Sequence, residues 1–397
     1  LIRIASLFNE KALLWIRGRK NIWQQIEQFK ALPQHKTLWM HVSSLGEFEQ
    51  GRPLIEQIKK QYPNIQVILT FFSPSGYEIR KNYSYADAIF YLPLDSPQNA
   101  KRFYNIINPH WIIFVKYDFW YYYIREAYLR NIPIFLISAV FKPNQLFFKP
   151  YGHLYRKMLH YFSQIYVQDE TSKLLLQKLN INSMVAGDTR CDRVLQIAQN
   201  PLPLNEIKNI IGQRFVIVVG SAWDEDLLIL KNSIEQTQGN DVLWIIAPHI
   251  VSESHIQSFL QMINLPSIRY TQMNNQTTFS PNSVLWIDTI GILSSLYQFA
   301  KIAYIGGGFG KGIHNTLEPA AFGVPLVFGP KYHKFNEAED MIKLGVAFSV
   351  KNADEAQHII YQLIQNNTLQ TQAAQKAQMY IQKSSGATQK IIQQIFD

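Results

Sequence analysis

The sequence predicts an α/β protein made of two lobes, each a parallel sheet with helices on both faces. At 397 residues the chain is too long for one ordinary core, and two domains of roughly 200 residues are the natural division. Short apolar runs alternate with helical stretches, which is typical of parallel sheets. The alternation restarts at 215–220, after the proline-containing segment 200–203. We therefore expect domains at 1–199 and 200–397, and the final helix either stays with the second or packs back on the first.

In the first lobe, apolar runs bounded by turn residues predict the strands. These runs are 37–42, 66–72, 88–92, 111–115, 133–138, 165–168 and 184–187. A loop at 43–46 leads into a helix that starts at Glu47. Ligands of parallel sheets bind at the carboxyl ends of strands, where Glu47, Ser73–Gly76 and Lys116–Asp118 all fall. We expect these places to share one cleft.

In the second lobe, residues 301–330 form the most informative stretch of sequence. The expected strands of this lobe are 215–220, 242–248, 284–286, 303–305 and 324–328. Between the last two of them, Gly306, Gly307 and Gly308 allow a tight turn and a close approach of the backbone to a ligand. Residues 301–330 therefore predict a strand, a glycine-rich loop, a short helix and a second strand.

The short helix of this stretch should begin near Thr316. Asn315 is a favourable N-cap, Glu318 stands at the capping-box position, and Gly323 is placed to end the helix. A helix start fed by a glycine loop suits a nucleotide phosphate, and Glu318 is placed to bind ribose hydroxyls. The alternative is a plain connecting turn, but the clustered glycines exceed what a connection needs. The spacing fits neither a Rossmann dehydrogenase nor a P-loop NTPase.

Composition favours an anionic partner. The chain has 38 Lys and Arg against 29 Asp and Glu, a net charge of +9. Such a balance suits nucleic acid, a phosphorylated substrate or an acidic membrane surface. The single cysteine, Cys191, excludes an intramolecular disulfide and a cysteine-cluster metal site, and it suits a reducing compartment.

Two segments suggest a membrane surface. The first twenty-three residues mix apolar and aromatic side chains with five basic ones, so they are either an interfacial amphipathic segment, as would remain from a longer anchor, or a basic surface helix. Residues 141–150 are rich in phenylalanine and also contain Lys142 and Lys149, and an exposed loop of this kind would suit an amphiphile.

Glu47 is the candidate general base. It follows Ser43, Ser44 and Gly46 at a helix start near the expected cleft, where it could accept the proton of an alcohol. The alternative is an ordinary carboxylate favoured by the helix dipole.

The chain resembles the bacterial 3-deoxy-D-manno-octulosonic acid (Kdo) transferases of lipopolysaccharide synthesis. The motifs that carry the resemblance run over nearly the whole chain and are HVSSLGEFEQGRP, TFFSPSGYE, GDTRCDRV, GSAW, IDTIGIL and GGGFGKGIHNTLEPAAFGVPLVFGP. The resemblance implies a GT-B fold, in which two Rossmann-like lobes face a central cleft. It implies that the first lobe binds lipid A precursor and the second CMP-Kdo, with no metal and no cofactor.

The resemblance also assigns site residues. Glu47 is the catalytic base of the S-x-G-E motif, and Asp118 is a second catalytic carboxylate. The donor-binding residues are Arg190, Ser221, Pro248, His249, Ile290, Gly291, Ile292, Gly308, Asn315, Thr316, Leu317 and Glu318. On the acceptor side we expect Ser73, Ser75, Gly76 and Lys142.

The chain departs from the family pattern in three places. Pro248-His249 replaces Pro-Arg, Ile290-Gly291-Ile292 replaces M-G-E, and residues 116–120 replace E-T-E-L-W. The acidic pair of the first lobe is thereby reduced to Asp118, and position 249 raises the question of how phosphate charge is matched.

The predicted function is transfer of Kdo from CMP-Kdo to lipid A precursor, by an enzyme at the cytoplasmic face of the inner membrane. It is held there peripherally or by an anchor before Leu1. The rival among enzymes is a GT-B transferase or epimerase that uses a UDP-sugar. A basic RNA-binding protein is disfavoured, since no RNP, KH or basic-stripe pattern occurs, so no nucleic acid is expected as a partner.

Overall fold

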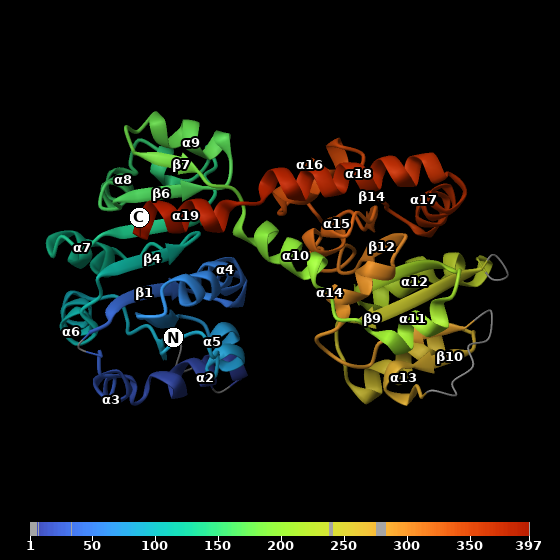
Figure 1. Cartoon of the computed structure of the whole chain (residues 1–397), viewed down its shortest axis with the longest axis horizontal. Helices are drawn as coiled ribbons and strands as arrows, with labels where there is room; N and C mark the ends of the chain where they lie inside the picture. The colour runs from blue at the N-terminus through green and yellow to red at the C-terminus, as the bar shows by residue number, and fades with distance from the viewer. Residues whose placement is uncertain (1–5, 7, 33, 238–240, 275–282, 397) are drawn as a thin grey trace. The chain divides into compact units, whose positions relative to one another are not determined.

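The chain folds into two compact units (Figure 1). The computed structural model describes residues 6, 8–32, 34–237, 241–274 and 283–396. The first unit holds Leu1–Asp192 and Ser385–Asp397, and the second holds Arg193–Ser384. The boundary thus falls inside helix α10 (Thr189–Gln199) rather than at 199/200, and helix α19 (Ala387–Phe396) belongs to the first unit.

The first unit contains a parallel sheet with the strand order β3-β2-β1-β4-β5-β6-β7. Apolar and β-branched residues dominate these strands because both faces of the sheet are covered. The strands are β1 (Lys36–Val42), β2 (Ile65–Phe71), β3 (Ala88–Tyr91), β4 (Trp111–Val115), β5 (Ile134–Ala139), β6 (Gln164–Val167) and β7 (Ser183–Val185).

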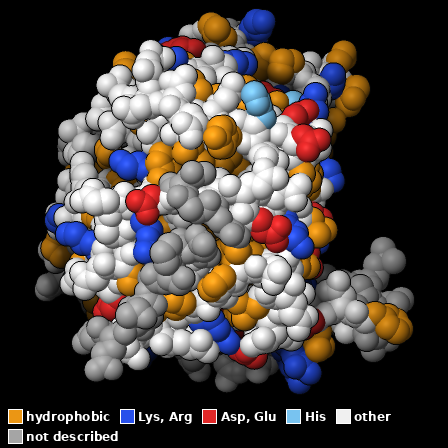
Figure 2. Space-filling model, turned by 90° about the vertical axis from the view of Figure 1, so that its right-hand side faces the viewer, with side chains coloured by type: hydrophobic (Ala, Val, Ile, Leu, Met, Phe, Trp, Pro, Cys, Tyr) orange, Lys and Arg blue, Asp and Glu red, His pale blue; other side chains and the backbone are white. Residues whose placement is uncertain are grey.

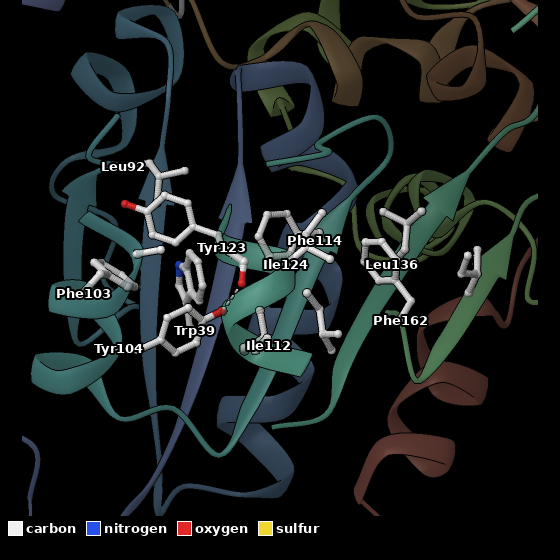
Figure 3. Close-up of a cluster of buried hydrophobic side chains, with 14 of the residues drawn as sticks. Trp39, Leu92, Phe103, Tyr104, Ile112, Phe114, Tyr123, Ile124, Leu136 and Phe162 are labelled. Carbon is white, nitrogen blue, oxygen red and sulfur yellow. Dashed lines mark hydrogen bonds between the residues drawn. The ribbon is translucent and has the colours of Figure 1, made fainter. Parts of the chain in front are cut away.

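Helices cover both faces of this sheet. They are α2 (Glu10–Arg19), α3 (Ile22–Glu27), α4 (Leu45–Gln61), α5 (Pro74–Arg80), α6 (Pro97–Ile107), α7 (Tyr121–Leu129), η1 (Leu146–Phe148), α8 (His153–Leu159), α9 (Glu170–Gln177) and α19. Because side chains alternate along a strand, Trp39 packs with Phe103, Phe114 and Tyr123 on one face (Figure 3). Its neighbour Met40 belongs to the core on the other face, where α4 and α19 pack.

The second unit repeats the architecture with the strand order β10-β11-β9-β8-β12-β13-β14, again parallel. Its strands are β8 (Phe215–Ala222), β9 (Val242–Pro248), β10 (Ser267–Arg269), β11 (Val284–Trp286), β12 (Ile302–Ile305), β13 (Leu326–Phe328) and β14 (Ala347–Ser349). The two edge strands, β10 and β14, were not predicted from the sequence.

The helices of the second unit begin after α10. They are α11 (Asn205–Ile211), α12 (Asp224–Gln236), α13 (Glu253–Met262), η2 (Tyr270–Gln272), α14 (Leu293–Leu296), η3 (Tyr297–Phe299), α15 (Leu317–Ala321), α16 (Asn336–Lys343), α17 (Ala353–Gln365) and α18 (Asn367–Ser384). The expected single final helix is two helices, because Gly386 adopts φ +90° between α18 and α19.

Strand order in each sheet reverses at one place. In the first unit the reversal lies between β1 and β4, and in the second unit it lies between β8 and β12. The loops that follow such a pair splay apart and open a crevice at the carboxyl edge of the sheet, which is where open α/β sheets bind ligands. The predicted segments at 43–47, 116–118 and 306–308 follow three of these strands, and Ser221 lies at the end of the fourth, β8.

Two surface properties bear on the partners. On the face drawn in Figure 2, described acidic and basic side chains are scattered among apolar and uncharged ones, so the positive excess does not gather into one patch on that face. Within the described part of the chain, every helix is too short or too polar to cross a membrane.

Candidate active site

Glu47 lies in the turn that joins β1 to α4. Ser44 has an extended backbone and forms the N-cap of α4, so Glu47 falls in the first helical turn. The hydroxyl of Ser44 donates a hydrogen bond to Glu47 Oε2. Glu47 is only partly buried. The serine therefore orients a carboxylate that remains within reach of solvent.

Asp118 follows β4 and is bound to the same turn. It is 7% exposed, and its Oδ2 accepts the backbone N–H of Ser43 at 2.9 Å. Its Oδ1 accepts the Ser43 hydroxyl. Burial raises the pKa of Asp118 to about 7, and the charge of Glu47 adds to the rise, while the Ser43 bonds oppose it. The structure thus brings both predicted catalytic carboxylates to one turn.

Sequence reasoning missed His41, which lies behind this turn. The ring is fully buried near the end of β1, with Nδ1 2.8 Å from Thr70 Oγ1 and Nε2 3.8 Å from Asp118 Oδ2. Complete burial lowers the pKa of His41 to about 3, and the charge of Arg19 adds to the lowering, while a hydrogen bond at Thr70 opposes it. The available signal was a polar residue within the apolar run TLWMHV, two positions before Ser43.

The acceptor-side candidates lie beside the same turn, apart from Lys142. Ser73 is the N-cap of α5, its backbone N–H donates to Ser43 O at 2.7 Å, and its hydroxyl lies 2.9 Å from that of Ser75. A Cβ at Gly76 would lie 3.0 Å from the carbonyl carbon of Ser44, so glycine lets α5 approach the turn. Lys142, by contrast, is exposed in the loop after β5.

Arg19 of α2 fixes the N-terminal helix to this edge of the first unit. Its guanidinium donates to Phe72 O at 2.7 Å and lies over the rings of Trp15, Phe72 and Tyr91. Burial lowers the pKa of Arg19 to about 10. The basic N-terminal segment therefore includes a helix that packs beside the Phe72–Ser73 loop.

The prediction of an exposed aromatic surface at 141–150 was wrong for two of its phenylalanines. Phe141 and Phe147 are 3% and 6% exposed and pack in the core of the first unit, because their rings find apolar neighbours there. The exposed apolar side chains nearby are instead Leu146, Tyr151, Leu154 and Tyr155.

In the second unit, glycines allow backbone segments to meet at the end of β12. A Cβ at Gly306 would lie 2.1 Å from Ser221 O, and one at Gly308 would lie 2.5 Å from the backbone N of Gly329. Ser221 itself has φ +55° at an irregularity of β8. Larger residues at Gly306 and Gly308 would push these loops apart, so the glycines serve close packing of the loop.

A buried carboxylate holds this loop. Asp226 is fully buried at the start of α12, and it accepts bonds from the N–H of Gly307 at 2.8 Å and of Trp223 at 3.0 Å. The Tyr304 hydroxyl donates to it at 3.0 Å. Burial raises the pKa of Asp226, although these three bonds favour the ionised form. Sequence reasoning did not single out this residue.

The helix start after the glycine loop differs from the prediction. Helix α15 begins at Leu317, with Thr316 as its N-cap, and the expected capping box between Asn315 and Glu318 does not form. Pro319 takes the N3 position and has no N–H for a cap to bind. Asn315 instead accepts the Leu317 N–H at 3.0 Å and donates to Glu318 Oε1 at 2.9 Å.

Position 249 belongs to a stack of three rings. His249 lies between Trp223 and His314, with ring centroids 4.3 Å and 4.5 Å away, and Trp223 Nε1 donates to His314 Nε2 at 3.1 Å. Burial lowers the pKa of His314 to about 4 and also lowers that of His249. Neither ring carries a full positive charge at neutral pH. The arginine of the family pattern is thus replaced by a neutral ring beside Pro248, the last residue of β9.

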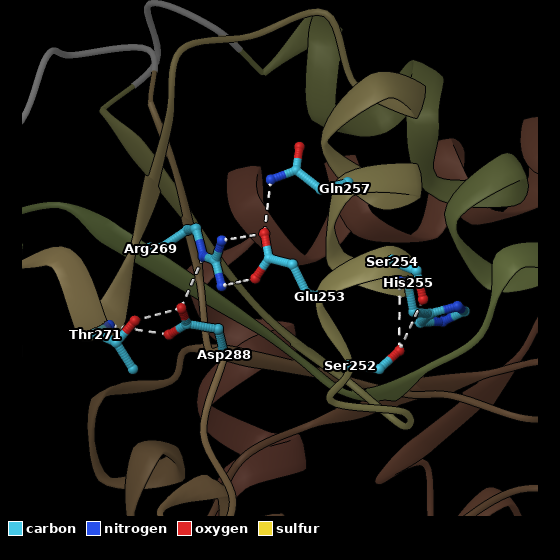
Figure 4. Close-up of polar contacts among 8 residues, drawn as sticks. All are labelled: Ser252, Glu253, Ser254, His255, Gln257, Arg269, Thr271 and Asp288. Atoms are coloured by element: carbon cyan, nitrogen blue, oxygen red, sulfur yellow. Dashed lines mark hydrogen bonds and ion pairs between the residues drawn. The ribbon is translucent and has the colours of Figure 1, made fainter.

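The segment Ile290-Gly291-Ile292 follows an anchored residue. Asp288 accepts bonds from Arg269 Nε at 2.8 Å and from the Thr271 N–H at 2.9 Å, and Arg269 also pairs with Glu253 (Figure 4). Ile290 is 81% exposed and Gly291 has φ +92°. The network therefore fixes the chain just before an exposed turn.

Arg190 is placed differently from the other donor candidates. It lies in the first unit at the start of α10, and its guanidinium is paired with Asp188 at 2.7 Å. The remaining predicted donor residues lie in the second unit, at the ends of β8 and β9, in the loops after β11 and β12, and at the start of α15.

Comparisons with solved structures define the class of fold. The UDP-GlcNAc 2-epimerase from Neisseria meningitidis bound to UDP-GlcNAc has a TM-score of 0.63 at 17% identity, over 90% of this chain and 98% of that one. Acinetobacter baumannii MurG has a TM-score of 0.59 at 14% identity, over 91% and 99%. Two seven-stranded parallel sheets with these likenesses define a GT-B fold, and the predicted fold class is confirmed.

Sequence comparisons then give the family. A family model described as 3-deoxy-D-manno-octulosonic-acid transferase (kdotransferase) matches residues 20–193. The 3-deoxy-D-manno-octulosonic acid transferase of Aquifex aeolicus is 29% identical over 327 residues, 80% of this chain and 83% of that protein. That of Haemophilus influenzae is 26% identical over 381 residues, 91% and 86%. Over most of its length the chain is thus similar to the Kdo transferases, a family of glycosyltransferases, as the resemblance predicted.

Proposed function

We propose that this protein transfers Kdo from CMP-Kdo to a hydroxyl of lipid A precursor (lipid IVA), with inversion and without a metal ion. The similarity to Kdo transferases over most of the chain supports Kdo transfer in the synthesis of the lipopolysaccharide core. The proposed mechanism rests on the turn after β1, where Ser44 orients the accessible Glu47 beside the buried Asp118.

Glu47 is the general base of the proposed reaction. The acceptor hydroxyl oxygen forms a bond to the anomeric carbon of Kdo while its proton passes to Glu47. The bond from that carbon to the phosphate oxygen of CMP breaks, and its electron pair leaves with CMP. Attack opposite the leaving group inverts the anomeric configuration in a single displacement, so no covalent intermediate is required.

The second unit is the proposed donor site. The buried hydroxyl of Thr316, which has no hydrogen-bond partner among the described residues, is the proposed donor to a phosphate oxygen. Glu318, oriented by Asn315, is the proposed partner of the ribose hydroxyls. Because burial lowers the pKa of His249, the proposed phosphate recognition at that position relies on hydrogen bonding more than on charge.

The test is a transfer assay with Glu47→Gln. Purified protein is incubated with lipid IVA and either CMP-Kdo or UDP-GlcNAc, and mass spectrometry counts the added sugars. We expect Kdo addition only. Since glutamine keeps the shape but cannot take the proton, Glu47→Gln should reduce turnover by about 10²- to 10⁴-fold and leave CMP-Kdo affinity unchanged.

The matched control is Glu49→Gln, two residues further along α4, where Glu49 pairs with Arg80 at 2.8 Å. Partly exposed ion pairs contribute little, so this variant should keep parental turnover. Turnover of Glu47→Gln within threefold of the parent at an equal melting temperature would remove Glu47 from the mechanism. Use of UDP-GlcNAc in place of CMP-Kdo would overturn the proposed donor.

The proposed location is the cytoplasmic face of the inner membrane, on anionic lipid. Exposed Leu146, Tyr151, Leu154 and Tyr155 lie on or beside η1 and α8, and the basic residues of the same region are Lys142, Lys149, Arg156 and Lys157. No Asp or Glu occurs from 127 to 168. Apolar side chains among basic ones, without acids, suit an anionic lipid surface.

Replacement of Lys142 and Lys149 by glutamate tests this surface. Each basic residue near an anionic leaflet contributes about 1 kcal/mol, so removing two should weaken vesicle binding by at least roughly 30-fold at low salt. Cosedimentation with phosphatidylglycerol vesicles measures it. Lys208→Glu with Lys351→Glu makes the same change of charge on exposed residues of the second unit and should bind like the parent. Equal loss in both double variants would contradict a specific surface.

A further inference from the structure

A polar chain of side chains runs behind the catalytic turn, through three neighbouring strands. Trp39 and His41 come from β1, Thr70 from β2, and Asp118 from the loop after β4. His41 and Thr70 are fully buried, and His41 is enclosed by the rings of Phe114 and Trp120. Polar groups placed so deeply require a partner or a role, because burial without hydrogen bonds is costly.

The neighbouring hydrogen bonds bear on which nitrogen of His41 carries the proton. Trp39 Nε1 can only donate, and it donates to Thr70 Oγ1 at 2.9 Å. We assign the hydrogen of the Thr70 hydroxyl to the contact with His41 Nδ1, 2.8 Å away. The neutral ring then has its own hydrogen on Nε2, the nitrogen without a hydrogen-bond partner in the described chain, which faces Asp118 Oδ2 at 3.8 Å.

Asp118 in turn ties down the turn that presents Glu47. Both donors of Ser43, its N–H and its hydroxyl, go to this carboxylate. The carbonyl of Ser43 accepts the Ser73 N–H at 2.7 Å, which joins the turn to the start of α5. The next residue, Ser44, orients Glu47. Loss of the Asp118 bonds would therefore free the turn on one side.

We propose that His41 is a positioning residue for Glu47. Its Nε2–H faces Asp118 and keeps that carboxylate the acceptor of both Ser43 donors, and the turn that carries Glu47 is held in place as a result. We call the contacts that join His41, Asp118 and Ser43 the latch. The latch rests only on the contacts described above, whereas its effect on catalysis rests on the proposed function.

The N–H of His41 affects the fraction of Asp118 that is ionised near neutral pH. Burial brings the pKa of Asp118 to about 7, so near neutral pH a modest dipole alters the fraction that is ionised. Protonated Asp118 would be a weaker acceptor for Ser43, and the latch loosens as pH falls through 7. The charged or titratable groups that face Asp118, His41 or their loop are Arg19, Glu47, Lys116, Tyr117 and Asp169.

Two substitutions separate the nitrogen atoms of the ring. In His41→Gln the side-chain amide reaches the place of Nε2, so an N–H still faces Asp118. In His41→Asn the shorter amide reaches only the place of Nδ1, so the contact with Thr70 is kept and the donor toward Asp118 is lost. The pair differs by one methylene group and matches in polarity, which makes each the control of the other.

The first measurement does not depend on activity. Hydrogen exchange of a peptide that covers 42–48 reads the Ser43 N–H, and peptides from β2 and β4 report whether the unit is folded. We expect exchange at the turn to be roughly tenfold faster in His41→Asn and Asp118→Asn, since a bond to a charged acceptor is weakened or lost. In His41→Gln it should stay within about twofold of the parent.

The second measurement is Kdo transfer across pH. We expect a roughly tenfold lower kcat in His41→Asn with an unchanged KM for CMP-Kdo, and a rise of activity with pH that moves to higher pH because Asp118 ionises later. His41→Gln should restore both. Equal behaviour of the Asn and Gln variants in the exchange measurement would overturn the latch. Absence of Kdo transfer by the parent would refute the proposed function and leave the exchange result as the test of the latch.

Discussion

His41 and Asp118 should give the first unit two opposite dependences of stability on pH. The pKa of His41 is lowered from 6.5 to about 3 by burial, so its contribution is complete above pH 6.5 and is lost as pH falls. The pKa of Asp118 is raised from 3.8 to about 7 by burial, so its contribution is complete below pH 3.8 and is lost as pH rises through 7. Between pH 4 and 6.5 the two slopes oppose each other in the parent.

Single substitutions should reveal each slope. One pKa unit corresponds to about 1.4 kcal/mol, and pH 5 lies 1.5 units below the unfolded value of His41. Asp118→Asn removes the aspartate slope, so between pH 7 and pH 5 the free energy of unfolding should fall by about 2 to 3 kcal/mol relative to the parent. His41→Gln removes the histidine slope, so the same change of pH should raise it by about 2 kcal/mol relative to the parent.

The assay must report the first unit alone, because a protein of two units need not unfold in one step. The denaturant midpoint at which peptides from β1 and β2 exchange their amide hydrogens meets this need, at pH 7 and at pH 5. Exposed His153 on α8 supplies the control, and His153→Gln should follow the parent. The reasoning is refuted if Asp118→Asn and His41→Gln shift in the same direction, or if neither departs from the parent by more than about 0.5 kcal/mol.

Two further predictions concern the second unit. Gly308→Ala places a Cβ 2.5 Å from the backbone of Gly329, so it should destabilise the unit by about 1 to 3 kcal/mol and weaken CMP binding, measured by calorimetry, more than tenfold. The control Gly310→Ala, whose Cβ meets nothing closer than 3.7 Å, should do neither. Equal CMP affinities of the two variants would show that the loop does not serve the donor. Glu318→Ala should raise the KM for CMP-Kdo by about ten- to hundredfold and leave the KM for the lipid unchanged, because a hydrogen bond to a charged group is lost. An unaltered affinity for CMP-Kdo would show that Glu318 does not bind the donor.

The sheets could be predicted because their strands are apolar runs bounded by turns. Strands β1, β2, β4, β9 and β11 lie within a residue of the expected ranges. The edge strands β10 and β14 were not predicted because each includes polar residues, Ser-Ile-Arg and Ala-Phe-Ser, whereas β11, of the same length, is apolar throughout. Short edge strands are defined by the neighbour they pair with, and that neighbour is distant in sequence.

The site could be predicted where the residues stand in local motifs. Glu47 was singled out as a candidate from a serine and glycine turn before a helix, and the glycine loop from its spacing. The start of α15 was predicted one residue early, because Pro319 at N3 excludes the capping box that Asn315 and Glu318 suggested. The phenylalanines at 141 and 147 were expected at the surface, since a loop sequence does not show which of its rings reach the core.

What local sequence could not show is that each unit supports its site with a buried carboxylate across the switch point of its sheet. In the first unit Asp118, after β4, accepts the N–H of Ser43, after β1, from 75 positions away. In the second, Asp226, after β8, accepts the N–H of Gly307, after β12, from 81 positions away. Each bond joins the loops of the two strands between which strand order reverses, where the splayed loops would otherwise lack mutual contacts. A carboxylate can accept several N–H and O–H donors at once, so one buried acid fixes a loop that an apolar side chain could only pack against.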